Sequence, residues 1–226
     1  MTASSSRSPA PPPPRPIRVL IADDHAIVRR GLKEILAETD DIAAAAEAST
    51  GREALQAARG DGFEVVLLDI ALPDMNGLEV LKQLRALRPS LRVLMLSVYP
   101  EEQYALRSLR SGAAGYLTKD SAPDELVEAV RRVSRGGRYV SRALAEQLAA
   151  ALGEERTPEP HHALSDREFE VLRRLGAGRT VGEVAAELSL SAKTVSTYRA
   201  RLLNKLGLRT TADIVRYAIE QGLAEL

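Results

Sequence analysis

Four short apolar segments of the chain are each followed by a polar side chain that could do chemistry. These side chains are Asp23 with Asp24, Asp69, Ser97 and Lys119. Apolar runs of this length, bounded by turn residues, are typical of buried parallel strands. The carboxyl ends of parallel strands line the crevice in which ligands bind, so we expect these side chains to converge. Three carboxylates packed together repel one another, and oxygen ligands without thiolates favour a hard, partly hydrated ion such as Mg²⁺.

A carboxylate beside Mg²⁺ and a lysine can attack phosphorus and form an aspartyl phosphate. The metal and Lys119 would then neutralise the phosphoryl charge, and the Ser97 hydroxyl would donate a hydrogen bond to it. Each of these residues alone is more simply interpreted as a solvated loop residue. Their register on consecutive elements favours a site. His25 follows the acidic pair, and we place it on the loop that enters the next helix rather than among the ligands.

Strands and helices are expected to alternate five times over residues 17–137. Strands are predicted at 17–22, 42–48, 65–68, 93–96 and 115–117, and helices at 26–36, 50–58, 78–87, 101–111 and 123–135. The alanine-rich segment 42–48 favours helix by propensity, and only its place in the alternation makes it a weak edge strand. This order predicts an α/β fold with a parallel sheet and right-handed crossovers.

Beyond residue 137 the pattern changes to helices only. Residues 138–163 form a linker: 143–152 are compatible with an isolated helix, and 153–162 are polar and contain proline. The two linker histidines, His161 and His162, are expected to be solvated. From Leu164 onward, capping residues mark the starts of four short helices; they are Ser165 with Glu168, Thr180 with Glu183, Ser191, and Thr210 with Asp213.

Residues 180–206 have the spacing of a helix-turn-helix. In its second helix Val195, Leu202 and Leu206 share one face, while the opposite face is polar. Residues 193–209 contain five basic and no acidic residues, which in a chain of balanced charge indicates contact with a phosphate backbone. An ordinary solvated basic helix is the alternative. The candidate DNA contacts are Lys193, Ser196, Thr197, Arg199, Arg201 and Lys205.

Length and composition exclude several classes of protein. A chain of 226 residues can form two modest domains, each with its own core. It contains no cysteine, which excludes disulfides, a thiolate metal site and a cysteine nucleophile. It also lacks a run of about 18 apolar residues that could span a membrane. Residues 1–16 are rich in serine and proline and are expected to be a disordered leader. A cytoplasmic location is expected.

Residues 17–137 resemble the receiver domain of two-component response regulators. The motifs that carry the resemblance are DDH at 23–25, VRRGL at 28–32, LLDIALPDMNGLE at 67–79, MLS at 95–97 and GYLTKD at 115–120. The resemblance implies a five-stranded, flavodoxin-like sheet in which Asp69 accepts a phosphoryl group. It implies that Asp24 binds Mg²⁺ directly, Asp23 through water, and Ala71 through its backbone carbonyl. Ser97, Lys119 and Tyr116 would sense the phosphate, with the ring of Tyr116 moving inward as a switch.

Residues 164–226 resemble the effector domain of the LuxR/NarL/FixJ class. The resemblance lies in LSDREFEVLRRLGAGRT, EVAAELSLSAKTVSTY and LLNKLGL. It implies that residues 192–205 enter the major groove of DNA, usually in a dimer. The class often has lysine where Ser196 stands and histidine where Tyr198 stands, and these departures shift the expected contacts toward Lys193, Thr197 and Arg201. The stripe of Ile214, Tyr217 and Ala218 is interpreted as core or as a dimer seam.

Together these features predict a phosphorylation-controlled DNA-binding transcription regulator. Its expected partners are a sensor histidine kinase, double-stranded DNA and a second copy of the chain when phosphorylated, with no membrane. One alternative is a scaffolding module whose receiver binds partners without phosphorylation. Another is an enzyme acting through an aspartyl phosphate, which would need a second acid two residues after Asp69, where Ala71 stands.

Overall fold

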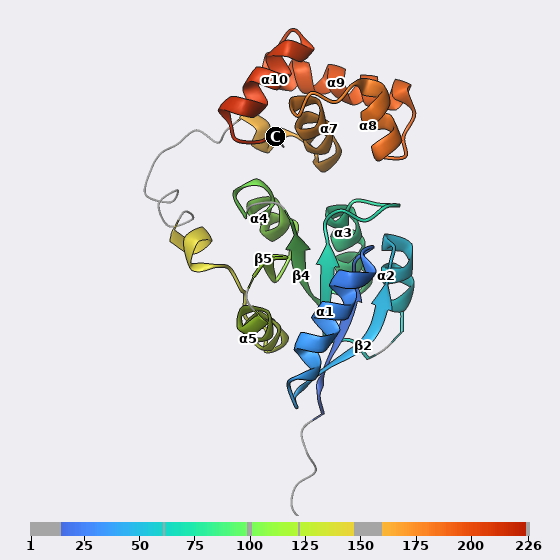
Figure 1. The fold of residues 1–226 in the computed structure, drawn as a ribbon, viewed down its shortest axis with the longest axis vertical. Coiled ribbons are helices and arrows are strands. Elements are labelled where there is room, and N and C mark those ends of the chain that lie inside the picture. Colours follow the sequence, from blue (N-terminus) through green and yellow to red (C-terminus); the bar gives the residue numbers. More distant parts are fainter. Residues whose placement is uncertain (1–14, 61, 99–100, 122, 147–159, 225–226) are drawn as a thin grey trace, which may run out of the picture.

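An α/β domain and a smaller helical domain make up the chain (Figure 1). The computed structural model describes residues 15–60, 62–98, 101–121, 123–146 and 160–224. Most of the expected leader, and residues 147–152 of the expected linker helix, lie outside these ranges; residues 142–146 are helical. Among the described residues, no helix is both long and apolar enough to cross a membrane.

A five-stranded parallel sheet forms the centre of the first domain. Its strands are β1 (Ile17–Ala22), β2 (Ile42–Ala48), β3 (Val65–Asp69), β4 (Arg92–Ser97) and β5 (Gly115–Thr118). They lie in the order β2-β1-β3-β4-β5, so the alanine-rich segment is an edge strand, as predicted. The chain reverses its direction of winding between β1 and β3, and a crevice opens at such a switch point beyond the strand ends.

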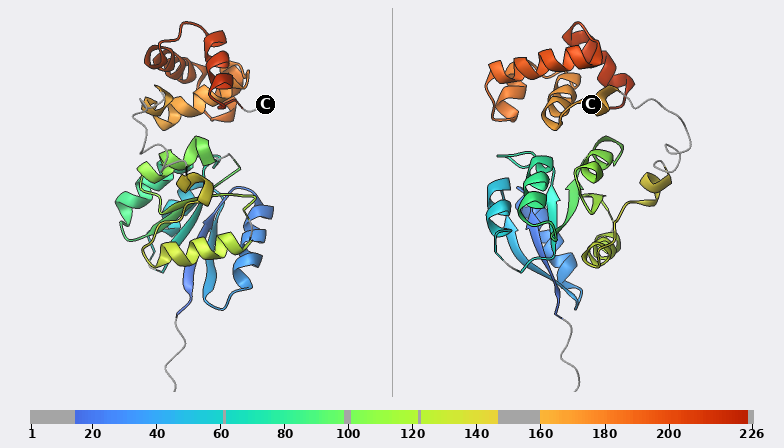
Figure 2. Two further views of the ribbon diagram at one scale, coloured as in Figure 1. Left: turned by 90° about the vertical axis from the view of Figure 1, so that its left-hand side faces the viewer. Right: turned by 180° about the vertical axis from the view of Figure 1, so that it is seen from behind.

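Helices cover both faces of this sheet (Figure 2). One layer consists of α1 (Ala26–Ala37) and α5 (Pro123–Ser134), and the other of α2 (Gly51–Ala57), α3 (Gly77–Leu87) and α4 (Glu101–Arg110). Val65 and Leu67 pack into the first layer, and Val66 and Leu68 into the second. All four side chains are fully buried, each stabilising the fold by roughly 1.5–3 kcal/mol. Burial on both faces explains why β3 reads as an uninterrupted apolar run.

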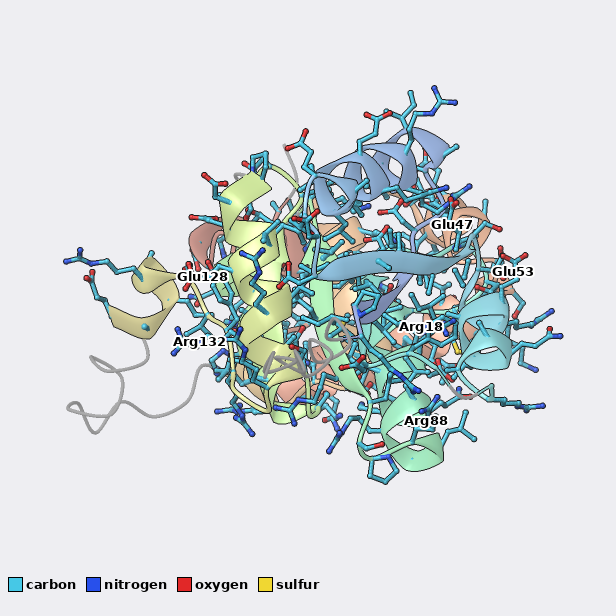
Figure 3. All side chains as sticks on the ribbon, turned by 90° about the horizontal axis from the view of Figure 1, so that it is seen from below. Arg18, Glu47, Glu53, Arg88, Glu128 and Arg132 are labelled. Atoms are coloured by element: carbon cyan, nitrogen blue, oxygen red, sulfur yellow. The ribbon has the colours of Figure 1, made fainter. Side chains whose placement is uncertain are left out.

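The loops at the amino-terminal edge of the sheet are fixed by arginines. The Arg88 guanidinium donates a hydrogen bond of 2.7 Å to the Gly60 carbonyl, and that of Arg18 lies 5.9 Å from the centre of the Phe63 ring. Both arginines are labelled in Figure 3, which views this end of the molecule. These contacts therefore anchor the amino-terminal ends of the strands, and the carboxyl-terminal ends carry the polar strand-end residues.

The loop between β3 and α3 is held on three sides. The Asp74 carboxylate accepts hydrogen bonds from the backbone amides of Gly51 (2.7 Å) and Arg52 (3.0 Å) at the start of α2. The Asn76 side chain caps α3 by accepting from the Leu78 amide at 2.7 Å. Gly77 lies so close to β3 that a Cβ atom there would be 2.2 Å from the Asp69 carbonyl oxygen. The loop that follows Asp69 is consequently fixed in position.

The second domain contains the four helices that the capping residues predict. They are α7 (Asp166–Gly176), α8 (Val181–Glu187), α9 (Ala192–Leu206) and α10 (Thr211–Glu220). Ser165, Thr180 and Thr210 form reciprocal capping boxes, and Ser191 accepts a hydrogen bond from the Thr194 amide. Val195 and Leu202 of α9 and Ile214 and Ala218 of α10 are fully buried, so two residues of the α10 stripe belong to the domain core, while the third, Tyr217, is partly buried.

The expectation that His161 is solvated is wrong. His161 lies in a 3-10 turn, η1 (Pro160–Ala163), with only 8% of its surface exposed. Its Nδ1 is 2.9 Å from the Tyr217 hydroxyl, and its ring stacks at 6.2 Å on that of Phe169. Burial, with smaller contributions from His162 and Arg107, lowers the pKa of His161 to about 4. Because the sequence around His161 is polar and contains proline, it did not indicate that this side chain joins η1 to the helical core.

Replacing Gly77 with alanine is expected to destabilise the first domain. The added Cβ would collide with backbone atoms of Asp69 and Ile70, which cannot rotate away, so we expect a loss of about 1–3 kcal/mol. Gly31→Ala is the matched control: its Cβ would meet nothing within 4 Å, and alanine should stabilise α1 by about 0.5–1 kcal/mol. Urea unfolding measures both, and equal effects of the same sign would contradict this packing.

His161 should make stability depend on pH. Because its folded-state pKa is depressed, the unfolded chain takes up a proton below about pH 6.5 while the folded chain does so only near pH 4. The free energy of unfolding should therefore fall as pH drops through this window, by at most about 1.4 kcal/mol per pH unit. His161→Gln should flatten this slope in urea titrations from pH 7 to 4; an unchanged slope would contradict the assignment.

Candidate functional site

Two buried carboxylates and one lysine form the centre of the site. Asp23 follows β1 and Asp69 ends β3, and these strands are neighbours at the switch point. The Lys119 ammonium, just beyond β5, lies 2.6 Å from the Asp23 carboxylate and 2.8 Å from Asp69 Oδ2. Asp69 is 1% exposed and its Oδ1 accepts a hydrogen bond from the Ala71 amide at 3.2 Å. The sheet thus brings together the residues that the sequence analysis singled out.

Burial and charge act in opposite directions on these groups. Burial, reinforced by the neighbouring Asp23, raises the pKa of Asp69, while Lys119 and the Ala71 amide oppose this rise. Burial also disfavours the charge of Lys119, but its hydrogen bonds with the two carboxylates raise its pKa above the usual value. The carboxylates are therefore held together by one ammonium group, and further positive charge would relieve their repulsion.

The donor set fits a hard divalent cation. Ligand atoms of Asp23, Asp24, His25 and Asp69 all lie within 4.8 Å of one another, and three of these residues are carboxylates. The Asp24 side chain is about a third exposed, whereas Asp23 and Asp69 are buried. Carboxylate oxygens at this spacing suit Mg²⁺, which keeps several of its waters. His25 is the N-cap residue of α1, and its Nδ1 lies 2.6 Å from Asp24, so it orients that carboxylate.

Ser97 and Tyr116 flank the site on neighbouring strands. Ser97 ends β4 beside Asp69, pairs with Thr118 in β5, and is 1% exposed. Its carbonyl accepts the Lys119 amide hydrogen bond at 2.8 Å, which links the two residues directly. Tyr116 on β5 is completely buried. A switch of Tyr116 stays a prediction.

The polar face of α9 is open to solvent. Lys193, Ser196, Thr197 and Arg201 are exposed, as the helix-turn-helix pattern predicts. The other two candidates have intramolecular partners: Arg199 donates to the Thr211 hydroxyl at 2.8 Å, and the Lys205 ammonium lies 2.6 Å from Glu168. Burial opposes the charge of Glu168, but hydrogen bonds from Lys205 and Ser165 lower its pKa. Lys205 would have to leave Glu168 to reach DNA.

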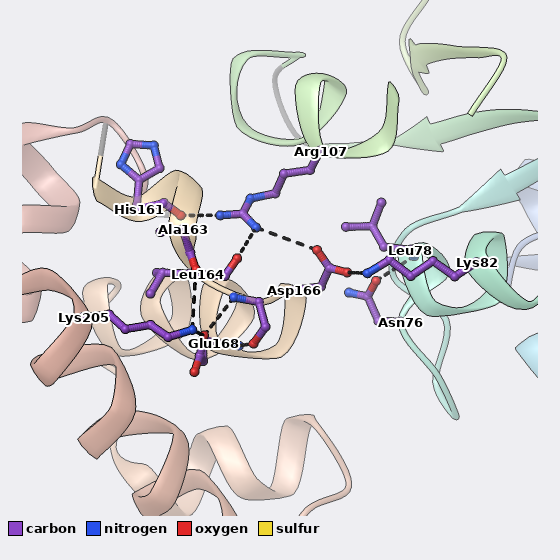
Figure 4. Close-up of polar contacts among 11 residues, drawn as sticks. Asn76, Leu78, Lys82, Arg107, His161, Ala163, Leu164, Asp166, Glu168 and Lys205 are labelled. Carbon is purple, nitrogen blue, oxygen red and sulfur yellow. Dashed lines mark hydrogen bonds and ion pairs between the residues drawn. The ribbon is translucent and has the colours of Figure 1, made fainter. Parts of the chain in front are cut away.

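A junction between the two domains was not foreseen from the sequence. Figure 4 shows Asp166, at the start of α7, between Lys82 of α3 (2.6 Å) and Arg107 of α4 (3.7 Å). The Arg107 guanidinium also donates to the carbonyls of His161 and Leu164 and lies 4.0 Å from the centre of the Phe169 ring. Only the exposed charge pattern of α3 and α4 hinted at such contacts, and it equally suits a solvated helix.

An aromatic contact completes this junction. The rings of Tyr104 on α4 and Phe169 on α7 meet edge to face, with centres 5.4 Å apart. The buried guanidinium of Arg173 donates to the Tyr104 hydroxyl at 3.0 Å. As a result, the hydrophobic core between the sheet and α2, α3 and α4 is continuous with the core of the helical domain. In both views of Figure 2, α7 faces the α/β domain while α9 lies further from it.

Comparison with known proteins gives matches to both domains. A model described as "Response regulator receiver domain" matches residues 19–131, and one described as "Bacterial regulatory proteins, luxR family" matches residues 162–218. The chain is 36% identical to response regulator UvrY of Escherichia coli, across 92% of this chain and 95% of UvrY. It is also 36% identical to response regulator GacA of Pseudomonas protegens, across 92% of this chain and 98% of GacA.

Solved structures show the same architecture. RcsB of Salmonella enterica serovar Typhimurium, solved bound to the promoter rprA in the presence of a phosphomimetic, matches 90% of this chain and 98% of RcsB. The TM-score is 0.65 and the identity 26%. The response regulator ChrA, of a heme-sensing two-component system, is 34% identical with a TM-score of 0.51 and covers 92% of this chain and 98% of its own.

Proposed function

We propose that this chain, which belongs to the two-component response regulators with a LuxR-type effector domain, binds DNA under the control of phosphoryl transfer to Asp69. The supporting observation is the convergence of Asp23, Asp69 and Lys119 at the switch point of the sheet. The phosphoryl donor would be a histidine kinase, and the reaction would take place in the cytoplasm, where the DNA is found.

The proposed acceptor chemistry is supported by the contacts around Asp69. A carboxylate oxygen of Asp69 attacks phosphorus, the bond from phosphorus to the donor nitrogen breaks, and the departing imidazole keeps the electron pair and takes up a proton. Lys119, already 2.8 Å from Asp69 Oδ2, is placed to neutralise charge on the transferred group. The Ser97 hydroxyl, at the end of β4, would donate a hydrogen bond to it.

Mg²⁺ is proposed to be held by Asp24, by Asp69 and by the Ala71 carbonyl, with Asp23 acting through water. When bound, it would neutralise negative charge on the phosphoryl oxygens. The observation that supports it is the group of three carboxylates, Asp23, Asp24 and Asp69, gathered at the strand ends. The fixed loop after Asp69, tied to α2 by Asp74, would keep the Ala71 carbonyl in place.

The proposed DNA-contacting surface is the exposed face of α9. Lys193, Thr197 and Arg201 lie on this face and would reach the major groove and its phosphates. RcsB, which shares the fold, has been solved bound to a promoter, and another structure contains two RcsB dimers bound to two DNAs. By analogy, we propose that phosphorylation favours a homodimer of this chain on double-stranded DNA.

Asp69→Asn should abolish labelling by a small phosphodonor such as phosphoramidate in the presence of Mg²⁺, because an amide oxygen is too weak a nucleophile. Phosphate-affinity electrophoresis measures the labelled fraction. The control is Asp124→Asn, an exposed acid at the start of α5, which should label like the unmodified chain. Undiminished labelling of Asp69→Asn would refute the assignment.

Arg201→Ala should weaken binding to any DNA duplex and reduce the slope of log K against log salt by about 0.9, the loss of one phosphate contact. Fluorescence anisotropy over a range of salt concentrations gives the slope. Arg216→Ala is the control, because Arg216 lies on α10, is paired with Asp213 at 3.2 Å, and is outside the proposed surface. An unchanged slope for Arg201→Ala would remove Arg201 from the interface.

A further inference from the structure

A small pocket at the amino-terminal edge of the sheet is lined by three arginines. They are Arg85 in the last turn of α3, Arg92 at the start of β4 and Arg138 in the segment after α5. The other lining residues are apolar or contribute backbone; they are Leu91, Val93, Gly112, Ala113 and Ala114. The volume of the pocket is about 80 Å³. It lies at the edge opposite the acceptor carboxylate, so it is a separate site.

The three guanidinium groups have no carboxylate partner in the part of the chain that the structure describes. Arg92 donates from Nε and Nη2 to three backbone carbonyls in and just after the last turn of α5, at 2.7–3.2 Å, which leaves Nη1. Arg85 donates from Nη1 to two carbonyls between α3 and β4, which leaves Nε and Nη2. Arg138 is exposed and has no partner among the described residues. The carbonyls orient two of the groups but do not cancel their charge.

Helix ends account for only part of this positive charge. Arginines often lie near helix C-termini, because each terminus carries roughly −0.5 of an elementary charge. The helices α3, α4 and α5 all end near lining residues, so together they supply about −1.5 against three positive charges. The two segments that provide the arginines, 80–100 and 129–145, contain no acidic residue. Positive charge therefore remains for an anion.

The dimensions of the pocket suit one phosphate group. A volume of about 80 Å³ corresponds to roughly two or three water molecules, at about 30 Å³ each. Guanidinium groups present paired N–H donors that match phosphate oxygens, and three of them favour a doubly charged phosphate over a single carboxylate. Gly112 leaves one donor uncovered, because a Cβ atom there would lie 3.3 Å from Arg85 Nε. A larger ligand would have to extend into solvent.

We propose that this three-arginine pocket binds the phosphate group of a small phosphate monoester, whose remaining part extends into solvent. The site takes no part in phosphoryl transfer, and the inference does not rest on Asp69 being the acceptor. A bound phosphate would connect α3, β4 and the segment after α5. It would stabilise the folded chain in proportion to its occupancy.

NMR titration of the full isotopically labelled chain locates the binding. The probes are inorganic phosphate and glycerol phosphate, added at constant ionic strength with EDTA to remove divalent cations. We expect the amide signals of Gly112 and Ala113 to shift along a saturable curve, and chloride to produce no such curve. The amide of Ala71 reports separately on the acceptor site. Shifts confined to Ala71, or shifts that do not saturate at Gly112, would overturn the proposal.

Arg138→Gln is the variant that tests the pocket, because its side chain is exposed and folding does not depend on it. It should weaken binding of both probes roughly five- to ten-fold, through loss of charge-assisted hydrogen bonds. Arg142→Gln is the matched control: Arg142 is exposed in the same segment, pairs with Glu146 at 2.9 Å and lies outside the pocket. The amide spectrum confirms that both variants are folded. Equal effects of the two substitutions would show attraction to general surface charge and would overturn the site.

A short DNA oligonucleotide tests whether the phosphate belongs instead to a nucleic acid. The proposal expects the oligonucleotide to bind the parent chain and Arg138→Gln with the same affinity, because its contacts are elsewhere. If Arg138→Gln weakens oligonucleotide binding as much as glycerol phosphate binding, the pocket is part of a nucleic-acid surface. That result would overturn the assignment to a small ligand.

Discussion

The ion pairs of the Lys119 ammonium group with Asp23 and Asp69 are the interactions around which the polar end of the α/β domain is built. This ammonium group lies within 2.8 Å of two carboxylates that protein atoms have almost completely removed from water. Burying two carboxylates costs free energy unless positive charge balances them, and one ammonium group balances only one. Excess negative charge therefore remains at the ends of the strands. This excess negative charge would favour the binding of a divalent cation.

The sequence was most informative where one local rule determines one local structure. The short apolar run from Val65 to Leu68, bounded by turn residues, favours a parallel strand covered on both sides, and it forms one. The capping pairs at Ser165, Thr180 and Thr210 begin helices because each pair satisfies amides within a single turn. The alternation of elements then placed Asp23, Asp69 and Lys119 at a common edge, because parallel strands end there together.

What the sequence could not predict depends on surfaces that meet across many residues. Arg107 and Arg173 appear in the sequence as ordinary basic positions of amphipathic helices, and nothing local indicates that Phe169 and Tyr104 lie beside them. His161 was misjudged for the same reason, since its burial depends on Tyr217, fifty-six residues away in the chain. Arg199 and Lys205 have intramolecular partners that periodicity alone does not reveal.

The orientation of α9 has a consequence for the regulation of transcription. Its polar face is exposed while the domains are docked, because α7 and α8, not α9, are turned toward the junction. Docking therefore leaves this face of α9 exposed, so the proposed DNA contacts would remain accessible in the unphosphorylated chain. In the proposed homodimer, the second copy would contact DNA intramolecularly, which would raise occupancy without any new contact to bases.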